Sequence, residues 1–346
     1  MPGDQLTRDL VMALIMFERA MRYLHPPLIP QLQEKLKPHL ARLAESLNAS
    51  ESEGAQPEGL LHGASLACEV LDRFLQIEDM ESAMANVLRS SRKWSLALET
   101  LYPLRRACED LYDLFLEPPA RERSSVLDPD PVHGTKVGLL HTCPVEDPYA
   151  RGCFSLYIPE SYDGSFPWPL VVALHGGYGH GRDFLWMWLR EAKSRRFLLL
   201  APTSRLDTWN IVQPAYDYDT LLAALEYIEA SWRIDHAHTL LTGLSDGATY
   251  ALACGLKEKS PFAALAPVAG VLPPIGLQHA HGLRIFWVHG KHDWMFPFQY
   301  AQQDCARLKE AGADVTLRII NDLSHAYPRE LNAAILTWLD TSLSLE

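Results

Sequence analysis

One stretch of the chain constrains the fold more than any other. Residues 238–253, HTLLTGLSDGATYALA, form an apolar segment that runs into Gly-x-Ser-x-Gly and continues as a helix of small residues. A turn from strand to helix in so few residues crowds the backbone around Ser245, so glycine is needed at positions 243 and 247, where a Cβ would collide with a neighbouring strand or helix. The sequence therefore predicts a nucleophile elbow that lifts the Ser245 hydroxyl above the edge of a sheet.

Composition limits the class of protein. The chain has 346 residues, 48% of them hydrophobic, and a formal net charge of −12. It can bury a substantial core, and no basic run offers the phosphate-neutralising surface that nucleic acid requires. The apolar run at 10–17 is short, follows no net-positive segment and has no cleavage site, so we expect a mature, cytoplasmic protein without a membrane span. Six cysteines show no CxxC spacing, and we expect reduced thiols.

The hydrophobic pattern divides the chain into two domains and a linker. Residues 1–117 have apolar positions at helical spacing and no strand-like alternation, which predicts an irregular bundle of four or five helices. Residues 118–132 are rich in proline and charge, which disfavours both a helix and a central strand, so we expect a linker. In residues 133–346 strand and helix patterns alternate, which predicts a mostly parallel sheet with crossover helices.

The expected elements follow from the same pattern and from its breaks. In the first domain Pro26, Pro27 and Pro30 end the first helix, residues 48–59 separate the second helix from the third, and Pro103 starts the last one. In the second domain the expected strands are a hairpin, the elbow strand and five others. These five are at 170–174, 197–201, 262–267, 284–289 and 315–320. The hairpin spans 134–142 and 153–159, and helices are expected at 182–195, 218–232, 299–311 and 329–341.

Residues at the ends of other expected strands fit the partners that a serine nucleophile needs. A serine alone is a weak nucleophile near neutral pH, so it requires a base and an acid that orients the base. Asp293 follows the strand at 284–289 and fits the acid. His325 lies after one more strand, immediately before the last helix, and fits the base. The chain order serine, aspartate, histidine is that of an α/β-hydrolase.

Backbone donors for a negative oxygen are expected at two places. The buried strand at 170–174 ends in His-Gly-Gly-Tyr, a loop whose exposed N–H groups can face a developing oxyanion. Gly177 is the first choice in this loop and Tyr178 the second. The partner donor is the N–H of Asp246, which lies in the first turn of the elbow helix, where backbone donors are unpaired.

Rivals exist for these roles. For the base they are His289 and His292, and for the acid they are Asp207, Asp217 and Asp219, none of which follows a late strand. The pairs His236/His238 and His279/His281 have a spacing that can chelate a metal but no third ligand, so we expect neither a metal nor a cofactor. Aromatic residues near the catalytic edge fit a substrate pocket, with core packing as the alternative for the first two: Trp186, Trp188, Trp209, Trp294, Phe296 and Phe298.

The motifs LHGGYG, TGLSDG, HGKHDWMFP and the Ser-His-Ala-Tyr-Pro loop resemble α/β-hydrolase esterases of the phospholipase/carboxylesterase and polyhydroxybutyrate-depolymerase-like group. The resemblance covers residues 133–346 and implies that carboxylic esters or thioesters are cleaved without a cofactor by Ser245, His325 and Asp293. Two departures stand out. Asp246 occupies a position where Met or Gln is common in this group, and Gly-Ala follows it in place of Gly-Gly.

These observations favour a serine esterase that cleaves a small-molecule ester through an acyl-enzyme intermediate. A thioesterase or a peptidase would use the same groups, and a non-catalytic binding protein on this fold is the alternative of a different class. We expect the helical domain to pack over or beside the catalytic edge and shape the substrate entrance, or else to form a homo-oligomer, because an amphipathic bundle must bury its apolar face.

Overall fold

The structure is a computed structural model that describes residues 2–54, 56–130 and 136–345. Contacts within the chain divide it into two compact units, Met1–Pro118 and Pro119–Glu346. Each unit buries apolar side chains of its own, such as Leu10 and Phe74 in the first unit and Val172 and Leu241 in the second. The two units are therefore described separately.

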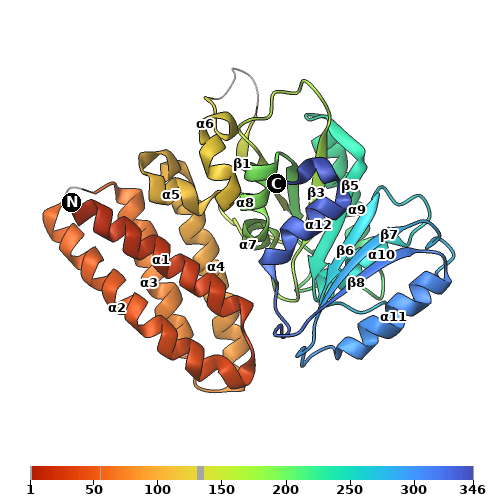
Figure 1. Cartoon of the computed structure of the whole chain (residues 1–346), viewed down its shortest axis with the longest axis horizontal. Helices are drawn as coiled ribbons and strands as arrows, with labels where there is room; N and C mark the ends of the chain where they lie inside the picture. The colour runs from red at the N-terminus through yellow and green to blue at the C-terminus, as the bar shows by residue number, and fades with distance from the viewer. Residues whose placement is uncertain (1, 55, 131–135, 346) are drawn as a thin grey trace. The chain divides into compact units, whose positions relative to one another are not determined.

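The first unit is helical, as predicted (Figure 1). Its helices are α1 (Pro2–Arg22), η1 (Pro26–Leu28), α2 (Ile29–Glu53), α3 (Glu58–Leu75), α4 (Met80–Leu101), η2 (Tyr102–Ala107) and α5 (Glu109–Leu114). Helix α1 already ends at Arg22, before the prolines that were expected to end it: Pro26 and Pro27 lie in η1, and Pro30 lies in the first turn of α2. Helix α2 continues into the predicted loop at 48–59. Pro103 lies in the 3₁₀ turn η2, and the last helix of the unit starts only at Glu109.

The apolar stripe of α1 is buried inside this unit. Leu10, Leu14 and Phe17 are almost completely buried. The Phe17 ring meets the edge of Phe74 from α3 at 6.0 Å, and the indole N–H of Trp94 from α4 donates to Leu14 O at 3.2 Å. Helix α1 therefore satisfies its apolar face against α3 and α4, as an amphipathic helix in a bundle does.

Part of the predicted linker is helical, which corrects the expectation for this segment. It contains η3 (Pro118–Arg123) and α6 (Ser124–Leu127). The two prolines at 118 and 119 stand in the first turn, where proline needs no N–H partner, so they start this helical segment instead of preventing it. Just after α6, Asp128 forms a buried ion pair of 3.1 Å with Lys193, which also bonds Glu160 at 2.7 Å. Residues 131–135, including the predicted start of the hairpin, lie outside the described residues.

The second unit is built on an eight-stranded sheet with the order β1-β2-β4-β3-β5-β6-β7-β8. Its strands are β1 (Gly138–His141), β2 (Phe154–Ile158), β3 (Trp168–Leu174), β4 (Leu198–Pro202), β5 (Ile234–Leu244), β6 (Ala264–Val268), β7 (Arg284–Gly290) and β8 (Asp314–Ile320). The β1–β2 and β2–β4 pairs are antiparallel and all the others are parallel. This confirms the predicted hairpin and the mostly parallel sheet.

Helices cover both faces of the sheet (Figure 1). On one face, α9 (Ala215–Glu229), α10 (Asp246–Gly255) and α11 (Phe298–Glu310) share a single apolar cluster with alternate residues of the strands. On the other face lie α8 (Leu189–Arg195) and α12 (Asn332–Leu339), where Trp338 packs on Phe286 of β7 at 5.5 Å between ring centroids. The alternation of strand side chains between two covered faces is the reason for the continuous apolar runs in the sequence.

The helix predicted at 182–195 is broken into α7 (Gly181–Phe184), a 3₁₀ turn η4 (Leu185–Met187) and α8. Trp186 and Trp188 are both buried. Residues two positions apart point to nearly opposite sides of an α-helix, so a regular helix could not bury both rings in one core. For these two tryptophans the alternative of core packing is confirmed.

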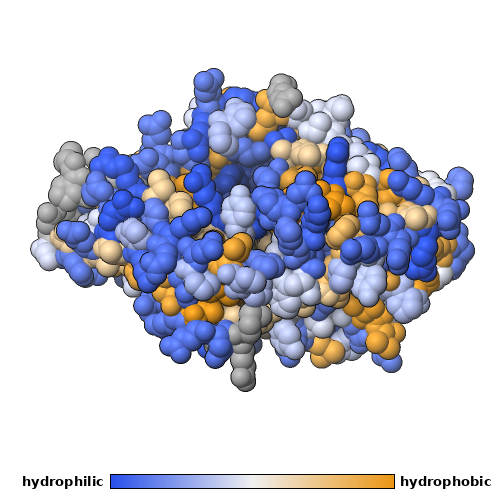
Figure 2. Space-filling view, turned by 60° about the horizontal axis from the view of Figure 1, so that its bottom comes forward, coloured by the Kyte–Doolittle hydropathy of each residue, from blue (hydrophilic) through white to orange (hydrophobic). Residues whose placement is uncertain are grey.

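The surface shown in Figure 2 is mainly hydrophilic, with apolar residues in small separate groups. Among the described residues, no helix has the length and apolar character needed to cross a membrane.

Candidate active site

The elbow has the crowded geometry that its glycines predict. Strand β5 ends at Leu244 and α10 begins at Asp246, so Ser245 alone makes the turn, with φ 56° and ψ −117°. A Cβ on Gly243 would lie 2.6 Å from the backbone of Gly247, and a Cβ on Gly247 would lie 2.4 Å from His175 O. The serine thus occupies a backbone conformation that non-glycine residues rarely adopt, held by close contacts on both sides.

Ser245, His325 and Asp293 come together in one hydrogen-bonded row. His325 Nδ1 lies 2.9 Å from Asp293 Oδ2, and His325 Nε2 lies 2.9 Å from Ser245 Oγ. An ionised carboxylate can only accept, so Nδ1 carries the proton of the neutral ring and Nε2 is free to accept the serine proton. Ser245 lies at the elbow, Asp293 in the loop after β7 and His325 in the loop after β8.

Asp293 is fixed from several sides. Its Oδ1 accepts the backbone N–H groups of Met295 at 2.9 Å and Phe296 at 2.8 Å, and its Oδ2 accepts from His325 and lies 3.3 Å from His289 Nε2. Burial opposes ionisation of this carboxyl, but hydrogen bonds from His289, His325 and the Phe296 backbone hold its pKa below the usual range. The carboxylate therefore stays charged below the pH at which an ordinary aspartate takes up its proton.

The loop after β3 contains Gly177 and Tyr178, the first and second choices for a backbone donor to the oxyanion. Their N–H groups differ in hydrogen bonding. The Tyr178 N–H donates to Asp207 O at 2.7 Å, so the second choice is already engaged. In the part of the chain that the structure describes, the N–H groups of Gly177 and Asp246 have no hydrogen-bond partner. These two donors stay available, and Gly177 lies in the segment that packs against the elbow, where a Cβ on Gly176 would be 3.6 Å from Ser245 Cβ.

A buried histidine supports this loop from inside. His175 Nε2 accepts the Ser204 N–H at 3.1 Å, so its proton is on Nδ1, which donates to Gly176 O at 2.7 Å. Burial lowers the pKa of His175 to about 3. The ring is thus neutral over the physiological range, and the tautomer is fixed by its two backbone partners.

The Asp246 carboxylate lies against the loop after β3. Its Oδ2 accepts the Thr208 hydroxyl at 2.5 Å and lies 2.8 Å from where a Cβ on Gly177 would be. A negative charge therefore stands beside the first turn of α10, where the helix dipole favours it. Thr208 was not identified from the sequence, because no motif connects the loop after β4 with the elbow.

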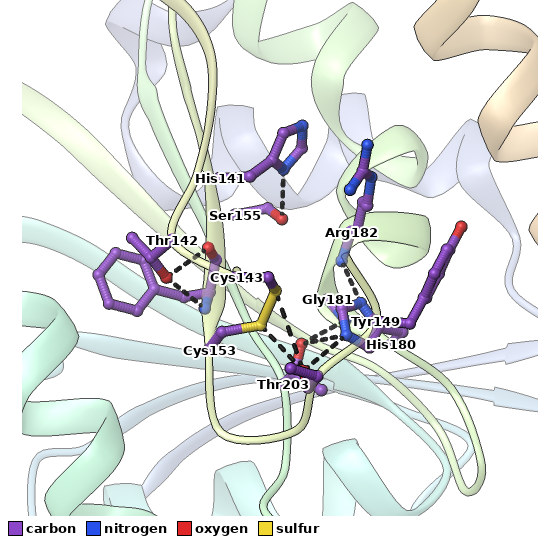
Figure 3. Close-up of a disulfide and its surroundings, with 12 residues drawn as sticks. His141, Thr142, Cys143, Tyr149, Cys153, Ser155, His180, Gly181, Arg182 and Thr203 are labelled. Atoms are coloured by element: carbon purple, nitrogen blue, oxygen red, sulfur yellow. Dashed lines mark hydrogen bonds between the residues drawn. A yellow bond between two sulfur atoms is a disulfide. The ribbon is translucent and has the colours of Figure 1, made fainter. Parts of the chain in front are cut away.

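A disulfide closes the loop between β1 and β2, which corrects the expectation of reduced thiols for two of the six cysteines. Cys143 and Cys153 are bonded, with their Cα atoms 5.2 Å apart. Figure 3 shows this disulfide with His180 beside it. Between the two cysteines, Arg151 donates to Gly179 O at 2.7 Å, and Ala150 O accepts from His180 Nε2 at 3.2 Å. We call residues 143–153 the strap, because they hold the outer side of the loop after β3.

The strap and the loop after β3 together form the single cluster with metal-ligand character among the described residues: Cys143 and Cys153 from the strap and His180 from the loop. Both sulfurs are used by the disulfide. His180 Nδ1 accepts the Arg182 N–H at 3.1 Å, so Nε2 carries the ring proton and has no lone pair for a metal. A metal-bound histidine normally donates through its other nitrogen, which is not the arrangement here.

The remaining candidates lie elsewhere. The exposed Asp207 and the buried Asp217 are not in the row, and Asp217 accepts the backbone N–H groups of Arg205 and Asn210. His238 bonds Asp235 at 2.7 Å, while His236, His279 and His281 are exposed. Trp209 is buried and Trp294 is half exposed beside Asp293. The sequence analysis considered His289 only as a rival for the base, and it gave no signal for a contact with Asp293. That contact depends on the loop after β7.

The strand order, the elbow and the two covered faces define the α/β-hydrolase fold, with an additional N-terminal helical region. Residues 215–343 match the phospholipase/carboxylesterase family. This match confirms the predicted resemblance to the α/β-hydrolase esterase group for that part of the chain, and it supports a hydrolase of the esterase kind. No curated protein matches the sequence.

Several solved structures are similar to the chain. Esterase PE8 is 23% identical, covering 51% of this chain and 94% of its own, with a TM-score of 0.43. SOBER1 of Arabidopsis thaliana is 18% identical, covering 51% and 99%, with a TM-score of 0.45. The S-formylglutathione hydrolase FrmB of Staphylococcus aureus is 14% identical, covering 62% and 99%, with a TM-score of 0.48.

Proposed function

We propose that this protein is a serine esterase that hydrolyses carboxylic esters through an acyl-enzyme intermediate. The observation that carries the proposal is the position of His325, which bonds Ser245 Oγ and Asp293 Oδ2 at 2.9 Å each. This is the arrangement in which one imidazole can accept a proton from a hydroxyl while a carboxylate stabilises the resulting cation. The match of residues 215–343 to the phospholipase/carboxylesterase family supports the same class.

In the proposed reaction, Ser245 Oγ attacks the ester carbonyl while its proton passes to His325 Nε2. Asp293 stabilises the imidazolium. The N–H groups of Gly177 and Asp246 donate to the negative oxygen of the tetrahedral intermediate. His325 then returns the proton to the leaving alcohol, and the Ser245 ester that remains is hydrolysed by a water molecule that His325 deprotonates in turn.

A labelling experiment tests the role of Ser245. A fluorophosphonate probe reacts with an activated serine, so we expect one label per wild-type chain and none in Ser245→Ala. Turnover of a p-nitrophenyl ester should be lost with the label, by a factor of about 10⁴ or more. The exposed Ser231→Ala, just after α9, serves as a serine control that keeps the label. Full labelling of the Ser245→Ala protein would exclude Ser245 as the nucleophile.

The substrate and the role of the helical unit remain proposals. Acyl chain length, aryl esters and acyl-CoA thioesters are to be compared in one activity screen, because thioesters need the same groups. The helical unit is proposed to shape the substrate entrance, with homo-oligomer formation as the alternative; light scattering of the full chain tests the latter. The cytoplasmic location stays a prediction. The Cys143–Cys153 bond bears on it, since disulfides form and persist mainly in oxidising compartments.

A further inference from the structure

His289 contacts the same carboxylate oxygen as His325. It lies near the end of β7, four residues before Asp293, and its side chain is fully buried. Its Nε2 is 2.8 Å from Phe296 O and 3.3 Å from Asp293 Oδ2. A carbonyl oxygen only accepts, so Nε2 carries the proton of the His289 ring and donates it to Phe296 O, with the Asp293 carboxylate as its second, longer contact.

The other ring nitrogen of His289 argues against a role limited to packing. Nδ1 is buried and has no hydrogen-bond partner in the described part of the structure. A buried polar atom without a partner lowers stability, and an apolar ring of similar shape would avoid this cost. What a histidine provides here and a phenylalanine does not is the donor at Nε2.

His289 is not placed to act as the base itself. Its proton-bearing Nε2 faces Phe296 O and Asp293, whereas Ser245 Oγ is bonded to His325. The ring is fully buried, so a substrate cannot reach it. Both histidines therefore contact the Asp293 carboxylate. His325 also contacts Ser245, whereas His289 is enclosed by the fold.

We propose that His289 is a positioning residue of the reaction, which holds Asp293 Oδ2 from the inside of the fold and keeps the carboxylate directed at His325 Nδ1. This inference rests on the proposed roles of Ser245, Asp293 and His325. Two backbone N–H groups hold Oδ1, but among the described residues the polar contacts of Oδ2 are the two histidines, His325 at 2.9 Å and His289 at 3.3 Å. Without His289, the oxygen that orients the base loses its fixed donor.

The loss of His289 should change both the rate and the pH dependence. A hydrogen bond to a charged group is worth enough to change a rate by about tenfold to a hundredfold, so kcat should fall by that factor with little change in KM. The ionisable side chains bonded to Asp293 are His289 and His325, and those bonded to His325 are Asp293 and Ser245. With one donor fewer, Asp293 binds the protonated His325 more strongly. The acid limb of the pH–rate profile should therefore move to higher pH.

The experiment compares three variants of the full chain with the wild type. His289→Phe removes the donor and keeps the ring volume, His289→Gln keeps an N–H donor at similar reach, and the exposed His292→Gln is the matched control. The kcat of each is divided by the fraction of protein labelled by fluorophosphonate, so that misfolded protein does not count. We expect the loss and the shifted acid limb in His289→Phe, substantial recovery in His289→Gln and no change in His292→Gln.

Two results would overturn the proposal. One is a His289→Phe protein with wild-type kcat per labelled site and an unchanged acid limb. The other is equal impairment of the Phe and Gln variants with an unchanged acid limb, which is the result of a packing role. If His289→Phe does not fold, His289→Asn, whose amide is too short to reach Oδ2, takes its place. Failure of the proposed function is distinguishable, because it appears as label and turnover that survive Ser245→Ala.

Discussion

The two sides of the proposed site are held in place by different means. On the reacting side, Ser245, His325 and Asp293 are joined by side-chain hydrogen bonds, and Asp293 accepts three hydrogen bonds and has His289 Nε2 at 3.3 Å. On the oxyanion side, the loop after β3 is fixed through its backbone, from inside by His175 and from outside by the partly exposed strap. Acid and reductants should therefore affect the loop of the oxyanion side first. The hydrogen-bonded row of Ser245, His325 and Asp293 should respond only to changes in its own residues.

The largest expected effect is on the reacting side. Asp293→Asn should lower kcat by about 10⁴, because the amide can donate to His325 Nδ1 and so fix the ring with its proton on Nε2, the wrong tautomer for a base. Steady-state kinetics on a p-nitrophenyl ester, with fluorophosphonate labelling as a count of folded sites, measures this loss. Asp322→Asn, on the exposed part of the loop that carries His325, is the control and should keep its activity. An active Asp293→Asn protein would remove Asp293 from the row.

The residues of the proposed site and the contacts that support them differ in how far they could be predicted from the sequence. The elbow was predictable because the crowding at Gly243 and Gly247 is local. Asp293 and His325 were predictable as neighbours because both follow parallel strands, whose carboxyl ends meet at one edge of the sheet. The structure brings them together with Ser245, and their catalytic roles stay a prediction.

The supports of the site could not be predicted in the same way. The Cys143–Cys153 bond depends on the register of β1 on β2, in which Gly138 pairs with Ile158, and the sequence gives no measure of that register. The use of the Tyr178 N–H by Asp207 depends on the path of a second loop. The donor role of His289 depends on the turn that returns Phe296 O to it. Each is a contact between loops, and loop geometry is set by tertiary packing.

The inner support of the oxyanion loop predicts a loss of stability in acid. Burial lowers the pKa of His175 to about 3, so between the ordinary value near 6.5 and that value the unfolded chain binds a proton that the folded chain does not. The stability from this group is complete above the ordinary value and falls by about 1.4 kcal/mol per pH unit below it, or roughly 2 kcal/mol at pH 5. The lowered pKa of Asp293 acts the same way but only below the ordinary carboxyl range, near pH 4, so it leaves this window untouched.

Urea unfolding at pH 7 and pH 5 measures this contribution. The wild type should lose more free energy of unfolding between the two values than His175→Asn does, and the exposed His236→Gln should lose as much as the wild type. Equal losses for the wild type and His175→Asn would mean that the inner support is not the acid-sensitive part of the loop.

The smallest expected effect concerns the outer support. Removing an oxyanion donor outright costs about 10²–10³ in kcat. Opening the Cys143–Cys153 bond leaves the Gly177 and Asp246 donors in the chain and frees only the strap that holds Gly179 O through Arg151, so we expect a loss of about fivefold to tenfold, well below that range. Reduction by a dithiol, followed by thiol counting and by reoxidation, measures it in the wild type. The Cys143→Ser/Cys153→Ser protein should show the same loss and no response to the reductant, and Cys68→Ser, in the helical unit, should behave as the wild type. A fully reduced wild type with unchanged kcat would show that the inner support, His175, holds the loop alone. Neither side of the site would then depend on the partly exposed strap.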